Sequence, residues 1–398
     1  MKRYLLILRM FLKARFIFKN PRKYDLVIFD NESISDFQNF IFNYDFFVLE
    51  VRIEKINKIY CTYKLLKYFF KYYKGNIMTA YLLSLIEIVS PKVILTNIDN
   101  SFKFSDLAKT LDNKINFVAV QNAARYNLKQ FEHLYKKNIN KSNFNERFYI
   151  PNFLCFGQFE IDDFKRYKIK IKNFFKIGSL RLANFFYYIN ANKIKLKKNS
   201  YDICLISEPA PGRDRVYGES NIEKGAVDTV KFTIKFCMKH NMKLVFPWKR
   251  DKKTNPKAFN MEMNFHKKYL TDNEFNYLLN NSLEKNEDGY SSYIAMFESK
   301  VVVARASTML REYLSTGGKI LSCNLTSTNI WDFPIQGICA LKNCTYEEFE
   351  ERLLQIYLMS EKDYFSKLNK SNHYAVEYNK EVSTIEKLKE KIDSFLTL

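Results

Sequence analysis

Short apolar runs alternate with amphipathic segments through the first half of the chain. The run at 24–30, YDLVIFD, ends in an acidic residue, as buried strands of parallel sheets often do. Segments with helical periodicity at about 60–73 and 77–89 lie between such runs. Strands that alternate with helices predict a parallel, doubly wound sheet. The strands expected in this half are 24–30, 45–51, 92–99, 116–122, 153–157 and 174–180.

A second alternation of the same kind begins at residue 201, after a polar, lysine-rich stretch. Gly317 and Gly318 follow the periodic positions of one helix and predict its end. The expected elements are strands at 201–209, 242–248, 300–307 and 319–324, and helices at about 221–240, 291–299 and 308–318.

Two alternations in 398 residues predict two domains, because a single core seldom grows to this size. The fold class we expect is α/β, with two Rossmann-like domains that face each other across a cleft. The predicted parts are a first domain at 1–180, a linker at 181–200, a second domain at 201–363, and helices at 364–398 that could pack back on the first domain.

The net charge of +21 is concentrated in one half of the chain. Residues 1–200 hold 36 basic and 16 acidic residues, whereas residues 201–398 hold 28 and 27. A genome rich in lysine codons would enrich both halves, so the asymmetry favours an anionic partner of the first half. Membrane lipid, a phosphorylated substrate and nucleic acid all have this chemistry.

The first 19 residues combine apolar and basic side chains. Basic residues interrupt the apolar run and no cleavage site follows, which argues against a signal peptide. Two interpretations remain open: a basic helix in a membrane interface, and an ordinary first helix packed on its own domain. No apolar stretch is long enough to predict a membrane span.

The chemistry-bearing residues exclude several classes of protein. The seven cysteines form no CxxC pair, and the four histidines form no ligand pair at helical spacing. We expect reduced thiols, no metal and no cofactor. Walker A, GxGxxG, GxSxG and HExxH motifs are absent, so a nicotinamide-dependent dehydrogenase and a metal-centred hydrolase are not expected.

Several charged or hydroxyl-bearing residues follow the strands of the second half. In open α/β sheets, ligands bind at the carboxyl ends of the strands. Hydroxyls and free amides at a helix N-terminus bind phosphate, and basic side chains neutralise it. The candidate donor-binding residues are Ser307, Thr308, Glu312, Lys249, Arg250, Arg213 and Glu208.

The first half offers its own candidates at two strand ends. Asp30 and Glu32 follow the first strand and could act as base or nucleophile. Gln121, Asn122 and Arg125 follow the fourth strand and are candidates for the acceptor side. Purely structural roles remain open for Asp30 and Glu32.

The segment 300–324 resembles the nucleotide-sugar half of GT-B glycosyltransferases: a strand, Ser307 and Thr308, then Glu312 and a glycine pair. The resemblance implies that the hydroxyl pair contacts phosphate and that Glu312 contacts ribose. VFPWKRD at 245–251 is similar to the HP-type motif of sialyl- and Kdo-type transferases, with Phe246 in place of the histidine.

Weaker similarity to surface-carbohydrate biosynthesis proteins of bacteria (capsule and O-antigen) is found at 117–127, 149–164 and 176–181. The first segment, FVAVQNAARYN, resembles their QHG or QNG turn, with Ala123 in place of the glycine. The third reads KIGSLR.

The function we expect is therefore a metal-independent GT-B glycosyltransferase. It would move a sugar from a CMP- or UDP-linked donor to a growing surface polysaccharide or an anionic, lipid-linked glycan. The expected location is the cytoplasm, with peripheral contact to the anionic inner membrane surface as an option. Two alternatives stay open: a sugar-nucleotide epimerase of the same fold, and a nucleic-acid-binding or interaction protein. No nucleic-acid-binding module is visible, so no nucleic acid is expected as a partner.

Overall fold

The computed structural model describes residues 10–125, 148–212, 214, 221–285 and 288–397. Two six-stranded sheets dominate this part of the chain, and every strand pair within them is parallel. The first sheet has the order β3-β2-β5-β6-β7-β8. Its strands are β2 (Leu26–Phe29), β3 (Phe46–Leu49), β5 (Val93–Thr96), β6 (Asn116–Val120), β7 (Tyr149–Cys155) and β8 (Lys170–Lys176).

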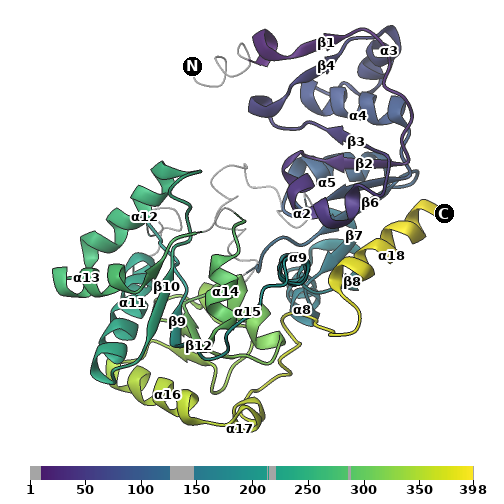
Figure 1. The fold of residues 1–398 in the computed structure, drawn as a ribbon. Coiled ribbons are helices and arrows are strands. Elements are labelled where there is room, and N and C mark those ends of the chain that lie inside the picture. Colours follow the sequence, from purple (N-terminus) through teal and green to yellow (C-terminus); the bar gives the residue numbers. More distant parts are fainter. Residues whose placement is uncertain (1–9, 126–147, 213, 215–220, 286–287, 398) are drawn as a thin grey trace.

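Helices cover both faces of the first sheet (Figure 1). One apolar cluster joins the strands to α3, α4, α5 and α8, and another joins them to α2, α9 and α18. The strands are buried on both sides, which explains their continuous apolar sequences. The bounds are α2 (Glu32–Ile41), α3 (Tyr63–Tyr72), α4 (Ile77–Val89), α5 (Phe102–Leu111), α8 (Gln158–Arg166), α9 (Leu180–Ala191) and α18 (Thr384–Thr397).

The second sheet has the order β11-β10-β9-β12-β13-β14. Its strands are β9 (Tyr201–Leu205), β10 (Leu244–Pro247), β11 (Ser282–Leu283), β12 (Ser299–Ala304), β13 (Lys319–Asn324) and β14 (Ala340–Lys342). Its helices are α11 (Ile222–Lys239), α12 (Pro256–Tyr269), α13 (Asp272–Asn280), α14 (Ser291–Phe297), α15 (Thr308–Ser315), α16 (Tyr346–Leu358) and α17 (Glu361–Ser366). The predicted α/β fold with two Rossmann-like domains is confirmed.

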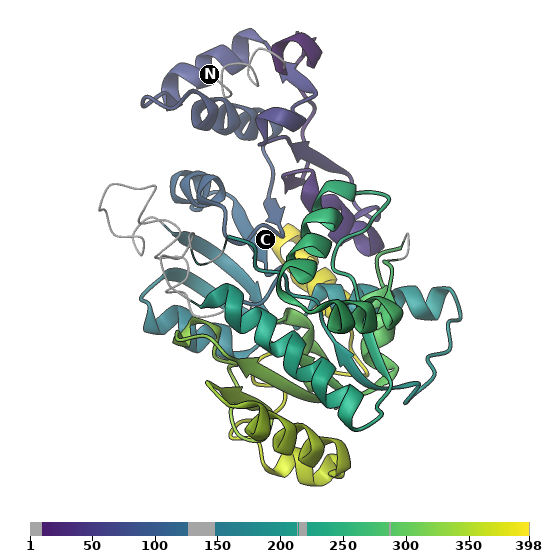
Figure 2. The same ribbon diagram turned by 90° about the vertical axis from the view of Figure 1, so that its left-hand side faces the viewer.

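A small lobe extends the first domain at the end of the molecule away from α16 and α17 (Figures 1 and 2). It contains a two-stranded parallel sheet of β1 (Arg15–Ile17) and β4 (Lys58–Tyr60), a short 3-10 turn at Ile53–Lys55, and the helix pair α3 and α4. The first 19 residues were interpreted as a helix in both alternatives. Of the described residues, 10–13 are helical but Arg15–Ile17 form a strand, because their backbone pairs with β4.

Two segments connect the domains. Residues 180–191, expected to lie mostly in a linker, form α9, whose Leu182 and Phe185 are buried in the second core. At the other end of the chain, α17 stays with the second domain through the buried Tyr364, and α18 returns to the first sheet. Gly157 and Gly178 make room for the returning chain, since a Cβ on either would lie within 2.8 Å of a backbone oxygen of residues 374–377.

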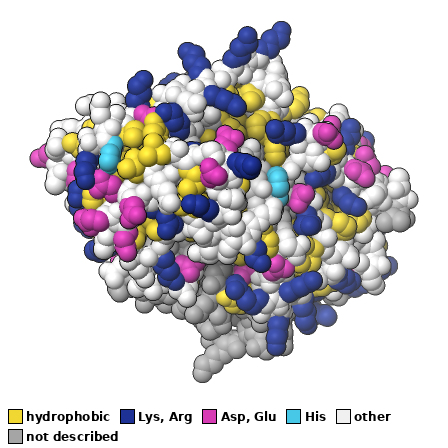
Figure 3. All heavy atoms as spheres, turned by 90° about the horizontal axis from the view of Figure 1, so that it is seen from below, with side chains coloured by type: hydrophobic (Ala, Val, Ile, Leu, Met, Phe, Trp, Pro, Cys, Tyr) yellow, Lys and Arg dark blue, Asp and Glu magenta, His cyan; other side chains and the backbone are white. Residues whose placement is uncertain are grey.

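The surface at the end of the molecule that contains α16 and α17 carries charges of both signs. Figure 3 shows the face below α16 and α17, where basic and acidic side chains are interspersed, in line with the near-neutral second half. Among the described residues, no helix is both long and apolar enough to cross a membrane.

Candidate functional site

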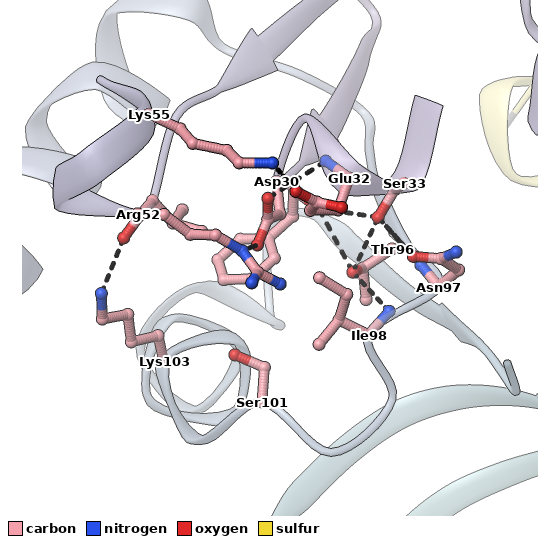
Figure 4. Close-up of polar contacts among 12 residues, drawn as sticks. Asp30, Glu32, Ser33, Arg52, Lys55, Thr96, Asn97, Ile98, Ser101 and Lys103 are labelled. Atoms are coloured by element: carbon pink, nitrogen blue, oxygen red, sulfur yellow. Dashed lines mark hydrogen bonds and ion pairs between the residues drawn. The ribbon is translucent and has the colours of Figure 1, made fainter. Parts of the chain in front are cut away.

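The two candidate catalytic carboxylates, Asp30 and Glu32, lie at the carboxyl end of β2 (Figure 4). Asp30 is buried, has a positive φ of 74°, and accepts hydrogen bonds from Arg52 Nε at 2.6 Å and from the backbone of Glu32 at 3.2 Å. Glu32 begins α2 and forms an ion pair with Lys55. Both carboxylates are therefore neutralised within their own domain.

A third carboxylate, Asp36, lies one turn further along α2. Ser33 Oγ donates to Asn97 Oδ1 at 2.7 Å, and Asn97 Nδ2 donates to Asp36. Burial raises the pKa of Asp36, while Arg181 and Asn97 act in the opposite direction. Sequence reasoning missed Asp36, because it lies inside a helix and not at a strand end.

The three acceptor-side candidates lie in the segment after β6. Gln121 is buried; its Oε1 accepts from the Phe156 amide at 2.8 Å. Arg125 pairs with the buried Asp99 and donates to Asn122 Oδ1 at 3.0 Å. Burial raises the pKa of Asp99, and Arg125 opposes that effect. These contacts fix the shape of the segment, and the acceptor role stays a prediction.

This segment reaches across to the second domain. The Ala124 amide donates to Thr308 Oγ1 at 3.0 Å, and Arg311 donates to the Arg125 carbonyl at 3.0 Å. Arg311 also pairs with Glu160 of α8 at 2.9 Å, with both side chains buried. Gln121 Nε2 donates to the same carboxylate oxygen at 3.0 Å. The segments after β6 and β12 thus meet where the carboxyl ends of the two sheets face each other.

The predicted donor-binding groups around the N-terminus of α15 contact the protein itself. Ser307 Oγ accepts from the Met309 amide at 3.3 Å, and Glu208 accepts from the amides of Arg305 and Ala306 at 2.7 and 2.8 Å. Because Thr308 is also bonded to the segment after β6, most of the hydrogen-bonding groups at the N-terminus of α15 already have partners within the protein. A phosphate there would have to displace these contacts.

Glu312 is fully buried in the interface between the domains. One carboxylate oxygen accepts from Ser179 Oγ, and the other accepts from Tyr293 Oη at 2.8 Å. Burial raises the pKa of Glu312, and the two hydroxyls oppose that effect. In this arrangement Glu312 joins α9 to α15, and the predicted ribose contact would require it to exchange a hydroxyl partner.

Lys249 and Arg250 follow β10, and their side chains are exposed. Their backbone amides donate to the Glu262 carboxylate of α12 at 3.1 and 3.0 Å. Ser207 donates to the same carboxylate. Glu262 therefore holds the turn so that the two basic side chains project from it. Arg213 lies outside the described residues.

Arg181 was not among the predicted site residues. It lies in the first turn of α9, its side chain is exposed, and among the described residues it has no hydrogen-bond or ion-pair partner. Neighbouring atoms partly shield the guanidinium from water and so lower its pKa, but Tyr293 and the carboxylates of Asp36 and Glu312 outweigh that effect and the pKa is raised. Its place between α2 and α15 puts a guanidinium at the domain interface. The signal was KIGSLR, which sequence reasoning noted without assigning a role.

Lys285, which follows β11, completes a group that we call the interface cations: Arg181, Arg250 and Lys285. Burial lowers the pKa of Lys285, and the positive charges of Arg181 and Arg250 lower it further. Asp251 and Glu262 oppose this without cancelling it. Lys285 is thus repelled by two neighbouring cations, and an anion bound beside the three side chains would relieve that repulsion.

Among the described residues, no group of three or more His, Cys, Asp or Glu is placed to hold a metal ion. His266 is buried against Phe246 and Trp248, and burial lowers its pKa to about 4. It is a neutral ring of the second core.

No protein-family model matches the chain, and no curated protein sequence matches it. Solved structures with a similar course of the chain include the wall teichoic acid polymerase TagF, with 9% identity over 94% of this chain and 89% of that one, at a TM-score of 0.47. UDP-GlcNAc 2-epimerase from Neisseria meningitidis has 13% identity over 94% and 100%, at 0.48. Trehalose 6-phosphate synthase from Burkholderia multivorans has 8% over 94% and 97%, at 0.49. At such values, function has to be argued from the side chains.

Proposed function

We propose that this chain is a glycosyltransferase that moves a sugar from a CMP- or UDP-linked donor to a growing surface polysaccharide or a lipid-linked glycan. Two parallel sheets whose carboxyl ends meet provide the place where α/β folds bind ligands. The family resemblance of residues 300–324 supports a donor of the nucleotide-sugar type.

The observation that carries the proposal is the position of Arg181. Its guanidinium lies at the interface near Lys285 and Arg250, without a hydrogen-bond or ion-pair partner in the described part of the chain. Guanidinium and ammonium groups stabilise the negative charge that develops on a departing nucleotide phosphate. The interface cations would serve that purpose without a metal ion.

The acceptor needs a base, and three carboxylates of the first domain are candidates. Asp30 and Glu32 are each held in an ion pair, with Arg52 and Lys55 respectively, which leaves them less free to approach an acceptor. Asp36 has a raised pKa and lies near Arg181, so it combines better basicity with proximity to the proposed phosphate site. We therefore add Asp36 to the earlier pair and favour it.

Nucleotide binding tests the proposal. We expect CMP, CDP, UDP or GDP to stabilise the protein, by about 2.7 kcal/mol at a hundredfold excess over the dissociation constant. Arg181→Gln should weaken binding of the preferred nucleotide by about 10- to 100-fold in calorimetry, the usual effect of losing a charge-assisted contact. Arg15→Gln is the matched control, because that arginine is also exposed and lies in β1 of the small lobe.

Two results would count against the proposal in different ways. If none of the four nucleotides binds the wild type, the donor class is wrong. If one binds and Arg181→Gln binds it equally well, the phosphate site lies elsewhere, for example at Ser307 and Thr308.

The acceptor and the location follow from the charge of the first half. Surface glycans are often carried on phosphate-bearing lipids, and a domain with a large excess of lysine favours such an acceptor. We propose a cytoplasmic enzyme that works at the anionic face of the inner membrane.

A further inference from the structure

The small lobe has an unusual surface for a part of a folded domain. Among the described residues, nine of the fifteen exposed large hydrophobic side chains lie in residues 11–18 and 63–77 of this lobe. Single exposed apolar residues are common, but a group of them marks an interaction site. The nine are Phe11, Leu12, Phe16, Phe18, Tyr63, Leu66, Phe70, Tyr73 and Ile77.

Helix α3 orders part of this group into a stripe. Tyr63, Leu66 and Phe70 are 86, 50 and 69% exposed and recur at helical spacing, so they share one face. Leu65 is the buried residue of the helix and belongs to the opposite side, where α3 packs on α4. The exposed stripe is therefore not the side that holds the helix to the protein.

A row of lysines runs beside the apolar stripe. Lys64, Lys67 and Lys71 occupy the positions next to Tyr63, Leu66 and Phe70, and all three are exposed. Residues 10–24 and 53–77 together contain eleven lysines and arginines and a single acidic residue, Glu54. An apolar stripe flanked by lysines is the pattern of helices that lie in the interface of an anionic bilayer.

An apolar groove continues this surface. It has a volume of about 630 Å³ and is lined by Phe11, Phe69 and Ile77, among others. Phe69 stacks on Tyr73, with ring centroids 5.6 Å apart, and so joins the groove to the exposed aromatic residues of α3. The groove and the stripe form one continuous apolar area on the lobe.

We propose that this face of the small lobe, formed by α3, the start of α4 and residues 11–18, docks on an anionic lipid bilayer. The aromatic stripe enters the interface between headgroups and chains, while Lys64 and Lys67 contact the lipid phosphates. The bilayer is favoured over a protein partner because basic residues outnumber acidic ones over this surface, even though Arg22, Lys55 and Lys71 are paired with acidic residues. This docking proposal rests on the proposed function only in naming a membrane as the partner.

Co-sedimentation of the full-length protein with vesicles tests this proposal. We expect binding to vesicles of phosphatidylglycerol and phosphatidylcholine, and much weaker binding to phosphatidylcholine alone. Phe70→Ser combined with Leu66→Ser should lower the partition coefficient at least tenfold at both low and high salt. Lys64→Glu combined with Lys67→Glu should lower it roughly 25-fold at low salt and much less at high salt.

Matched controls come from the second domain. Leu358→Ser removes a side chain that is 73% exposed, and Lys257→Glu with Lys267→Glu changes the net charge equally on α12. Both should bind vesicles like the wild type. Circular dichroism will show whether each variant is folded, which is expected because the replaced side chains are exposed.

Three outcomes would overturn the proposal. The wild type could fail to co-sediment, or the lobe variants could bind as well as the controls. The third is that the wild type is a dimer in analytical ultracentrifugation and Phe70→Ser with Leu66→Ser makes it monomeric, which would assign the face to self-association. Nucleotide binding is measured without lipid, so failure here leaves the glycosyltransferase proposal intact.

Discussion

Two arginines lie at the interface between the domains and have opposite surroundings. Arg311 is fully buried and bonded to Glu160 and to the Arg125 carbonyl. Arg181 is exposed, and the structure shows it no hydrogen-bond or ion-pair partner among the described residues. Glu312 lies between them: it follows Arg311 in sequence and accepts a hydrogen bond from Ser179, two residues before Arg181. The same interface thus contains one arginine bonded within the fold and one for which the described residues provide no hydrogen-bond or ion-pair partner.

The comparison shows why composition alone does not locate a binding site. A buried ion pair offsets a large desolvation cost, so removing one member leaves a charge that water cannot reach. An exposed arginine near other cations has no such role in the fold. Variants can therefore separate the two arginines. Changes to the Arg311–Glu160 pair should lower the stability of the fold, whereas a change to Arg181 should affect only ligand binding.

Glu160→Leu should give the largest effect. It leaves the Arg311 guanidinium buried without its carboxylate, and we expect a loss of about 3–5 kcal/mol in the free energy of unfolding. Glu160→Leu with Arg311→Met removes both charges and should recover much of the loss. Urea denaturation measures all three proteins. If the single and double variants are equally unstable, the loss comes from packing and not from the unpaired charge.

The pH dependence of stability sharpens the comparison, since two buried groups titrate with opposite sign. Burial raises the pKa of Glu160 to about 7, against the opposing effect of Arg311. The fold therefore favours the protonated carboxyl of Glu160, and the stability that this preference contributes is present at low pH and is lost as pH rises towards 7. His266 has a pKa lowered to about 4, so its contribution is present above pH 6.5 and is lost as pH falls towards 4.

Between pH 6.5 and pH 4, protonation of His266 should lower the free energy of unfolding of the wild type by about 2–3 kcal/mol, and His266→Phe should abolish this loss. Phenylalanine keeps a ring against Phe246 and Trp248 but has no proton to gain. Urea midpoints at half-unit pH steps give the slope. His373→Gln serves as the control. A wild-type slope unchanged by His266→Phe would show that this ring is not the group that titrates.

Glu312→Ala tests the residue between the two arginines. The buried hydroxyls of Ser179 and Tyr293 would lose their acceptor, and we expect a loss of about 2 kcal/mol in the free energy of unfolding. Glu312→Gln keeps an acceptor and should cost less. If Glu312→Gln retains stability but loses nucleotide binding in calorimetry, the ribose contact predicted from the sequence gains support.

Much of the fold could be predicted from the sequence. Buried parallel strands such as β2, β5 and β12 are continuous apolar runs, and the helix predicted at 77–89 is α4. The short strands β1, β11 and β14 were missed because two or three residues carry no periodicity. Their pairing depends on neighbours far away in the sequence, as with Arg15 and Lys58.

The site was harder to predict, because a strand-end position does not reveal a side chain's partner. Asp30 and Glu32 were chosen for such positions, and the structure pairs them with Arg52 and Lys55 from a later segment. Arg181 was missed because it lies inside a helix of the expected linker. The reason to include Arg181 in the site is its proximity to Asp36 and Lys285, which are distant in sequence and are brought near it only by the tertiary fold.

Arg181→Gln should have the smallest effect on stability, and that is its value as a test. The side chain is exposed and has no hydrogen bond to lose, so we expect a change within about 0.5 kcal/mol in the free energy of unfolding. Loss of the attraction to Asp36 and Glu312 and relief of the repulsion with Lys285 act in opposite directions, which keeps the net change small. Urea denaturation at low and high salt measures it, since salt screens both contributions. A loss of several kcal/mol would mean that Arg181, like Arg311, holds the domains together and is no free anion site.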